Sequence, residues 1–97
     1  MSTHSRPARV GQQIQEEVAR VLSRGLKDPR VGFVTVTGVK VAPDLRQATV
    51  YYSVMGDEKV LADTQAGLSA ARGYFRREVG HGLGLRYTPD LHFKYDP

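Results

Sequence analysis

Arginine side chains recur along one polar face of the segment between residues 58 and 82. Arg72 and Arg76 are four residues apart, which places them one above the other on a helix, with Arg77 beside them. Glu78 lacks the spacing that would compensate Arg72, so we expect the arginines of this face to be uncompensated. Such guanidinium groups are suited to binding a phosphate chain, and the alternative is a solvated helix face. Small residues that would let a polymer backbone approach closely lie beside them: Ser69, Ala70, Ala71 and Gly73.

Basic residues also lie outside this segment. Arg6 and Arg9 stand at the start of the first predicted helix, where cations oppose the helix dipole. That placement suggests an anionic partner, or side chains that simply point into water. The net charge of +4 is typical of nucleic-acid binders, but it is also an ordinary solubility margin for a domain of 97 residues. Residues 1–47 carry the whole excess.

No residue set argues for catalysis or for a cofactor. The sequence has no cysteine, which fits a reducing compartment, and its histidines lack the spacing of a metal site. It has neither a Gly-x-Ser-x-Gly elbow nor a phosphate-binding loop that ends in Lys-Ser or Lys-Thr. No apolar stretch resembles a signal region or a membrane span. We therefore expect a cytoplasmic, non-enzymatic protein without cofactor, metal, small-molecule substrate or membrane contact.

The elements that must position the arginines begin with a predicted hairpin over residues 31–55. Pro43-Asp44 separates two runs that are rich in β-branched and aromatic residues. In the second run, apolar residues at positions 48, 50, 52 and 54 alternate with polar ones. In the first run the valines change parity halfway, so we predict a β-bulge near Thr37-Gly38. The bulge would bring four valines onto one face: Val34, Val36, Val39 and Val41.

Helical periodicity flanks this hairpin. Pro7 suits the first position of a helix that ends near Gly25. A second amphipathic pattern runs from about residue 58 to about residue 82, with Gly73 inside it. We predict two helices that meet at a kink at Ala71-Arg72-Gly73, and the alternative is one helix with a tolerated glycine. The inward stripe of the first helix consists of Val10, Ile14, Val18, Val21 and Leu22.

The end of the chain completes the expected sheet. Residues 80–84 are predicted to form a loop, and residues 85–95 a third strand. Pro89 cannot donate a ladder hydrogen bond, so this strand should lie at an edge. A long helical crossover makes the second and third strands parallel. We expect an α+β domain over residues 6–97 after a flexible terminus over residues 1–5. Its order is α-β-β-α-α-β, with strand 48–55 central in a three-stranded mixed sheet and the helices on one face.

This order of elements resembles a type II KH domain, a fold that binds RNA. KH domains carry Gly-x-x-Gly between their paired helices, whereas this chain has Ala71-Arg72-Gly73 there. That kink and the string from Val34 to Ser53 are similar to the ribosome-binding factor A family, and residues 6–10, 27–31 and 86–93 match as well. One departure is that this chain ends at residue 97, whereas family members usually carry a further acidic or mixed tail.

The resemblance implies a bacterial assembly factor that binds free, immature 30S subunits. Family members contact 16S rRNA near its 5′ helix and the decoding region, support processing of the 5′ end and matter most in the cold. They leave when maturation is complete, helped by a GTPase or an initiation factor. The implied mechanism is binding by a monomer, and the alternative is a KH-like module that binds a protein partner, with RNA secondary.

Two groups of candidate RNA-binding residues follow from the resemblance and the charge pattern. The first group lies at the kink and along the helix behind it. The second group includes a basic cluster at the ends of the hairpin (residues 27, 30, 40 and 46) and the start of the first helix. Together they are Arg6, Arg9, Lys27, Arg30, Lys40, Arg46, Ser69, Ala71, Arg72, Gly73, Arg76 and Arg77.

Overall fold

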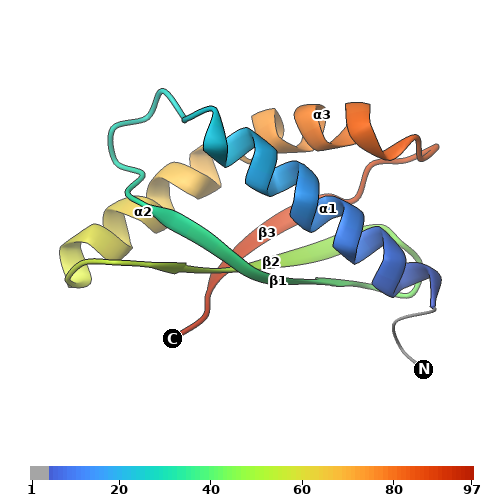
Figure 1. Ribbon diagram of the computed structural model, residues 1–97, viewed down its shortest axis with the longest axis horizontal. Helices are drawn as coiled ribbons and strands as arrows, with labels where there is room; N and C mark the ends of the chain where they lie inside the picture. Colours follow the sequence, from blue (N-terminus) through green and yellow to red (C-terminus); the bar gives the residue numbers. More distant parts are fainter. Residues whose placement is uncertain (1–4) are drawn as a thin grey trace.

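The computed structural model describes residues 5–97, and most of the expected flexible terminus (residues 1–4) lies outside the described residues. Three helices and three strands follow one another in the predicted α-β-β-α-α-β order (Figure 1). Their bounds are α1 (Arg6–Ser23), β1 (Val34–Val41), β2 (Gln47–Val54), α2 (Glu58–Ala70), α3 (Arg72–Leu83) and β3 (Asp90–Tyr95). None of the helices within residues 5–97 has the length and apolar character needed to cross a membrane.

Helix α1 begins at a side-chain cap. The Ser5 hydroxyl accepts a hydrogen bond from the Ala8 backbone N–H at 3.2 Å, so Ser5, which was predicted to be flexible, belongs to the start of the helix. Pro7 occupies the first turn, as predicted. Gly11 lets α1 approach the sheet closely, because a Cβ atom there would lie 3.1 Å from the Val39 carbonyl oxygen. The predicted apolar stripe of α1 faces the core.

The hairpin contains the predicted bulge. Val36 pairs with Tyr52 and Gly38 with Tyr51, which leaves Thr37 without a partner in β2. The four valines of β1 consequently pack on the same side, against the core. In the turn, Leu45 has a φ of 63°, and the Asp44 carboxylate accepts a hydrogen bond from the Arg46 N–H at 3.0 Å. The turn therefore fixes the backbone position of Arg46 just before β2.

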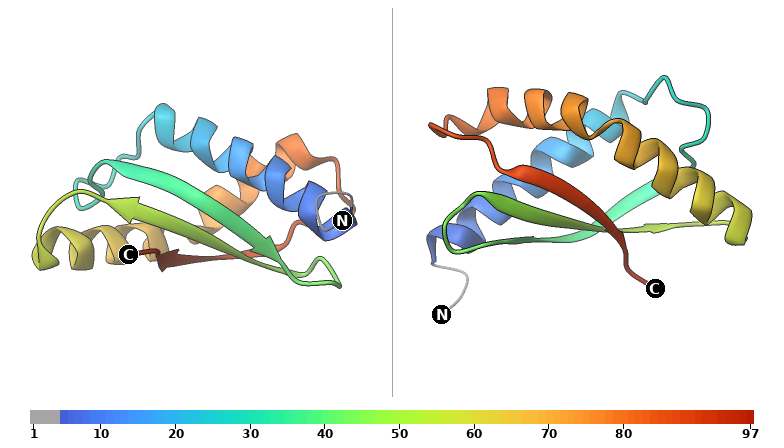
Figure 2. Two further views of the ribbon diagram at one scale, coloured as in Figure 1. Left: turned by 60° about the horizontal axis from the view of Figure 1, so that its bottom comes forward. Right: turned by 180° about the vertical axis from the view of Figure 1, so that it is seen from behind.

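Strand β3 pairs in parallel with β2 and forms an edge, so the sheet order is β1-β2-β3, as predicted. The three helices pack on one face of this sheet (Figure 2), and the core lies between them and the sheet. Across the layers, the Phe75 ring packs against the Phe93 ring, with centroids 4.9 Å apart. Thr64, the one buried polar side chain of the described residues, accepts a hydrogen bond from the Gly32 N–H at 3.3 Å.

Two predicted boundaries were wrong. Helix α3 continues through residues 80–83, which were predicted to be a loop, and ends at Gly84 with a φ of 64°. The burial of Leu83 against the core holds this last turn in spite of the low helix propensity of its glycines. The third strand begins at Asp90 and not at Leu85, because the preceding Pro89 is buried and has no N–H to donate.

Candidate nucleic-acid interface

The kink between α2 and α3 consists of one residue. Ala71 has φ −92° and ψ 6°, and it is both the last cap of α2 and the first cap of α3. Its N–H bonds to the carbonyls of Gly67 and Leu68 at 3.1 Å, and its carbonyl accepts from the Phe75 N–H at 3.0 Å. Leu68 and Phe75, one on each side, are fully buried. The core therefore fixes the bend, which excludes the alternative of a single straight helix.

Gly73 keeps the outer surface of the kink bare. A Cβ atom at Gly73 would meet only the Arg77 guanidinium, at 3.8 Å. Packing therefore does not require this glycine, whereas a backbone or phosphate that approaches the first turn of α3 would benefit from the missing side chain. Ser69 lies exposed before the kink, and its hydroxyl accepts a hydrogen bond from the Gln65 amide at 3.2 Å.

Arg72 is held against the exposed face of β3. Its guanidinium lies 3.3 Å from His92 Nδ1, and His92 Nε2 lies 2.6 Å from the Gln47 amide oxygen. These contacts join α3, β3 and β2 in one polar chain. They orient Arg72 without neutralising it, because none of its partners within residues 5–97 is a carboxylate. Arg72 therefore keeps its full charge at the surface.

The sequence-based expectation that Arg76 is uncompensated was wrong. Its guanidinium donates two hydrogen bonds to the Thr88 carbonyl, at 3.1 and 3.2 Å, and lies 3.4 Å from the Asp90 carboxylate. The parallel position of β3 brings these partners beside α3. Both side chains of the ion pair are more than half exposed, so solvent screens it and the arginine stays accessible. Within residues 5–97, Arg77 forms no ion pair with a carboxylate.

The loop from α1 to β1 packs against the kinked helices through Gly67. A Cβ atom at Gly67 would lie 2.6 Å from a Val31 methyl group and 3.5 Å from the Asp28 carboxylate. This close approach brings Lys27 beside the kink, where it lines a groove of about 450 Å³ together with Ala71 and other residues. Lys27 and the kink therefore share one surface, although they are more than forty positions apart in the sequence.

Arg30, by contrast, is engaged within this loop. Its guanidinium donates three hydrogen bonds to the Asp28 carboxylate, from Nε to Oδ1 at 3.0 Å and to Oδ2 at 3.1 Å, and from Nη2 to Oδ2 at 2.6 Å. Its backbone N–H donates to Oδ1 at 2.9 Å. These hydrogen bonds, the side-chain ones foremost, hold the pKa of Asp28 at about 2, below its usual value of 3.8. Arg30 therefore stabilises the loop and has less charge to offer a partner than Lys27.

The Asp28 carboxyl should titrate near pH 2 in a carbon-detected NMR titration of the folded protein. Because its pKa is lower in the folded state than in the unfolded chain, it contributes stability above about pH 4. This contribution is lost as the pH falls from about 4 to about 2. Arg30→Gln should raise the midpoint, since only the backbone hydrogen bond remains. A wild-type midpoint near 4 would show that the pair does not form in solution.

The remaining candidates lie away from Lys27. Lys40 lies near the end of β1, where it pairs with Thr49 of β2, and Arg46 lies in the hairpin turn. Most of the length of β1 therefore separates both residues from Lys27. The predicted cluster of residues 27, 30, 40 and 46 is thus divided between the two ends of the hairpin. Arg6 and Arg46 both line a groove of about 210 Å³ at the turn. Arg9 lies exposed on α1.

Three grooves form one basic band from the kink to the hairpin turn. A groove of about 330 Å³ is lined by Arg72, Gly73 and Arg76, and a larger one of about 530 Å³ continues along α3 from Gly73 and Arg76. The larger groove shares Arg86 and Tyr87 with the groove at the turn. Sequence reasoning gave no individual role to the residues that complete the band: His81, Arg86, Tyr87 and His92.

The reason for this omission lies in the wrong start of the third strand. Read as strand residues, Arg86 and Tyr87 would simply have alternated between two faces. Gly84 before them and Pro89 after them were the available signals that this stretch is a loop. The structure also contains no group of three metal-ligating side chains within residues 5–97 that could hold an ion.

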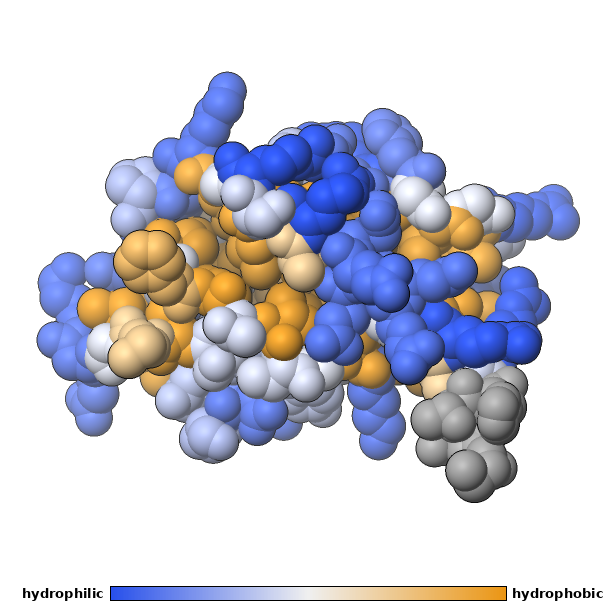
Figure 3. Space-filling view, in the orientation of Figure 1, coloured by the Kyte–Doolittle hydropathy of each residue, from blue (hydrophilic) through white to orange (hydrophobic). Residues whose placement is uncertain are grey.

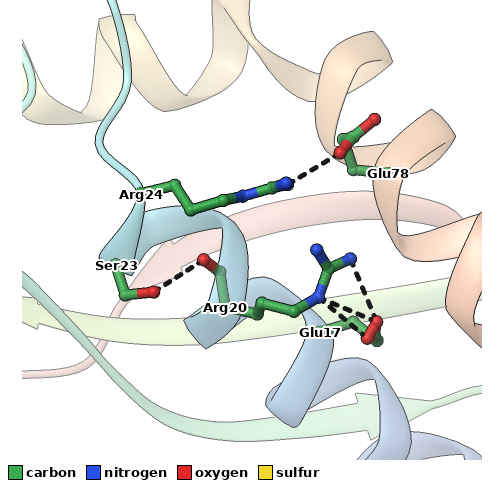
Figure 4. A network of polar contacts seen from close by, with 5 residues as sticks. All are labelled: Glu17, Arg20, Ser23, Arg24 and Glu78. Carbon is green, nitrogen blue, oxygen red and sulfur yellow. Dashed lines mark hydrogen bonds and ion pairs between the residues drawn. The ribbon is translucent and has the colours of Figure 1, made fainter.

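Helix α3 is oriented by α1 on the side away from the band. Arg24, the C-cap of α1, reaches Glu78 of α3 (Figure 4). The two side chains lie 2.7 Å apart, and Arg20 contacts Glu17 within α1 at 3.1 Å. The hydrogen bond from Arg24 lowers the pKa of Glu78 below its usual value. Glu78 thus points towards the end of α1, and the arginines of α3 lie on the opposite side of the helix.

The fold and this surface define a class of protein. The chain is a single KH-like α+β domain of type II whose paired helices bend at one residue, and a basic band follows the second helix of the pair. The family model described as Ribosome-binding factor A matches residues 6–97. The chain belongs to the ribosome-binding factor A family.

Named relatives and solved structures agree with this assignment. The ribosome-binding factor A of Anaeromyxobacter sp. strain K is 59% identical, over 99% of this chain and 70% of that protein. A solution structure from Thermotoga maritima is 32% identical with a TM-score of 0.84, covering 98% of this chain and 90% of that one. A homology model of ribosome binding factor A of Thermus thermophilus, as fitted into the cryo-EM map of its complex with 30S, has a TM-score of 0.66. At 24% identity over 92% of this chain and 89% of that one, it shows the fold alone.

Proposed function

We propose that this protein is a non-catalytic assembly factor of the small ribosomal subunit. It binds free 30S subunits through 16S rRNA and supports maturation of the 16S rRNA 5′ end in the bacterial cytoplasm, most of all in the cold. The protein acts as a monomer and needs no cofactor. Its family is named for ribosome binding, and the Thermus relative was fitted into a 30S complex.

The basic band along α3 is the observation that carries this proposal. Three arginines project from the exposed side of α3 behind a bare kink, and the grooves between α3 and β3 run along them. A groove lined by guanidinium groups suits a phosphate backbone, because each contact releases condensed counterions. The rigid bend adds shape selection, which dominates protein recognition of folded RNA.

Co-sedimentation with purified ribosomal particles tests the proposal. At low salt the protein should pellet with free 30S subunits and not with 70S ribosomes, and the pelleted fraction should fall steeply as the salt is raised. An interface that neutralises six to ten phosphates would lose affinity by a factor of roughly 10³ to 10⁵ when the salt is raised from 50 to 200 mM. If the protein stayed in the supernatant with every particle, the proposal would be wrong.

A second candidate function, a protein-interaction module, is favoured by one observation. Phe33 and Met55 flank the first pair of the hairpin and are 92% and 87% exposed. A nearby groove is lined mainly by Ala19, Leu22, Val34 and Val36, with a few polar residues. Figure 3 shows apolar surface gathered at this end of the molecule. Large exposed apolar patches mark protein contacts more often than RNA contacts.

Salt separates the two candidates in the same experiment. Docking through the apolar patch would survive high salt, because it neutralises no phosphates. Pelleting with 30S subunits that is unchanged by salt and abolished by Phe33→Ser together with Met55→Ser would therefore favour the protein-interaction module.

A further inference from the structure

Tyr87 is an exposed aromatic residue between two arginines. It lies in the loop between α3 and β3 and is 64% exposed. The guanidinium carbon of Arg86 lies 5.7 Å from the centre of its ring, and that of Arg46 in the hairpin turn lies 6.0 Å away. Both distances are at the outer limit of cation–π contact, so neither guanidinium is stacked tightly on the ring. The ring therefore remains open to a ligand.

The loop holds Tyr87 outward from both sides. Leu85, two residues before it, packs against the core, and Pro89, two residues after it, is fully buried. Between them, the Thr88 carbonyl accepts the two hydrogen bonds from Arg76. These anchors keep the chain in place on either side of the ring, so the side chain cannot fold inward without breaking them. The backbone at Tyr87 therefore has little conformational entropy left to lose on binding.

Tyr87 also stands where two grooves of the basic band meet. It lines the groove of about 530 Å³ along α3 and the groove of about 210 Å³ at the hairpin turn. Arg6, Arg46 and Arg86 provide the positive charge of the second groove, whose one acidic residue is Asp44. The Asp44 carboxylate is engaged by the Arg46 backbone N–H. A ligand at Tyr87 would thus have cationic side chains on both sides.

We propose that Tyr87 is the stacking platform for one unpaired base of an RNA strand, with Arg86 and Arg46 bound to the phosphates on either side of that nucleotide. Aromatic rings accept any base, since every base has a π-face, while the neighbouring arginines supply the affinity for the backbone. A base within a duplex cannot reach the ring, so the site selects single-stranded or looped-out nucleotides. The inference rests on the proposed RNA-binding function and gives it a specific contact.

Tryptophan fluorescence reports on this contact directly, because the chain contains no tryptophan. In the variant Tyr87→Trp, stacking with a base should quench the emission when a single-stranded RNA octamer is added. An octamer of equal charge made of abasic nucleotides should bind through its phosphates and leave the emission unchanged. The matched control is Phe33→Trp, which puts tryptophan at another exposed aromatic position at the opposite end of β1. Its emission should not change with either strand.

Affinity measurements with the same two strands complete the test. Tyr87→Leu should weaken binding of the normal octamer roughly five- to a hundredfold, while Tyr87→Phe keeps most of the affinity. Neither variant should change binding of the abasic strand, the salt dependence or the unfolding temperature, because Tyr87 is exposed.

Two failures are distinguishable in these measurements. If the wild-type protein binds the octamer and Tyr87→Leu binds it equally well, the stacking site is wrong and the proposed function stands. If the wild-type protein binds neither the octamer nor 30S subunits, the proposed function is wrong and the stacking site falls with it. Quenching of Tyr87→Trp by a peptide and not by RNA would overturn the inference in favour of a protein ligand.

Discussion

Reversing two charges in Arg72→Glu with Arg76→Glu should weaken binding to 30S subunits about a hundredfold or more. Both side chains are exposed in the grooves beside the kink, where each would contact a phosphate. A hydrogen bond to a charged group contributes about 1.5–3 kcal/mol, and the two new carboxylates would in addition repel the RNA. Titration of labelled protein with 30S subunits at several salt concentrations measures both the affinity and its salt slope. The slope should become shallower by about one unit for each lost contact.

The matched control changes the same net charge at another place. Arg20→Glu with Lys59→Glu also brings the net charge from +4 to zero, but these residues lie on α1 and in the first turn of α2. This control should bind nearly as well as the wild-type protein, and both double variants should remain folded. Equal loss of affinity in the two variants would mean that only the overall charge matters and that α3 has no special place in the interface.

Phe75→Ala should destabilise the protein by about 3–5 kcal/mol, a large part of the stability of a small domain. The Phe75 ring is fully buried against Phe93, and its backbone N–H closes the hydrogen bond to Ala71 across the kink. Urea unfolding followed by circular dichroism gives the loss of unfolding free energy. Tyr74→Ala is the control, since its neighbouring ring is 40% exposed and its loss should cost about 1 kcal/mol or less.

The pair of variants also tests the claim that the core fixes the bend. If Phe75→Ala cost no more than Tyr74→Ala, the bend would be set by local backbone preference and not by the buried residues on its two sides. The effects on RNA binding should have the reverse order. At a temperature where both variants are folded, Tyr74→Ala should weaken RNA binding more than Phe75→Ala, because Tyr74 lines the groove beside Lys27.

Much of the fold could be predicted because local patterns and long-range packing agree. The valines of β1 change from even to odd positions halfway along the strand, and a single bulge at Thr37 explains this change. The structure contains that bulge. The long helical crossover determined the parallel pairing of β3, and Pro89 indicated that it would be an edge strand. The break at residues 71–73 was visible in the glycine content and in the family resemblance, which the family match confirms.

The wrong predictions have a common physical cause. Glycines 80 and 82 favour a loop, but burial of Leu83 outweighs their propensity, and Gly80 leaves room for Thr88 of the following loop. The compensation of Arg76 depends on atoms twelve and fourteen residues away that only the completed sheet brings close. Local spacing rules describe neighbours on one helix, so they could not reveal these partners. The RNA-binding roles of the individual candidate residues remain predictions.

The parallel pairing of β3 has a consequence for the order in which the chain folds. The turn between β1 and β2 has five residues, whereas 35 residues separate β2 from β3. Closing the longer loop costs about 1.7 kcal/mol more chain entropy, and this cost must be met before any β2–β3 contact forms. The hairpin is therefore expected to form first and β3 to dock late. Because Thr88, Asp90 and His92 arrive with β3, the arginines of α3 receive their final orientation last, and an incompletely folded chain does not yet present the RNA-binding surface.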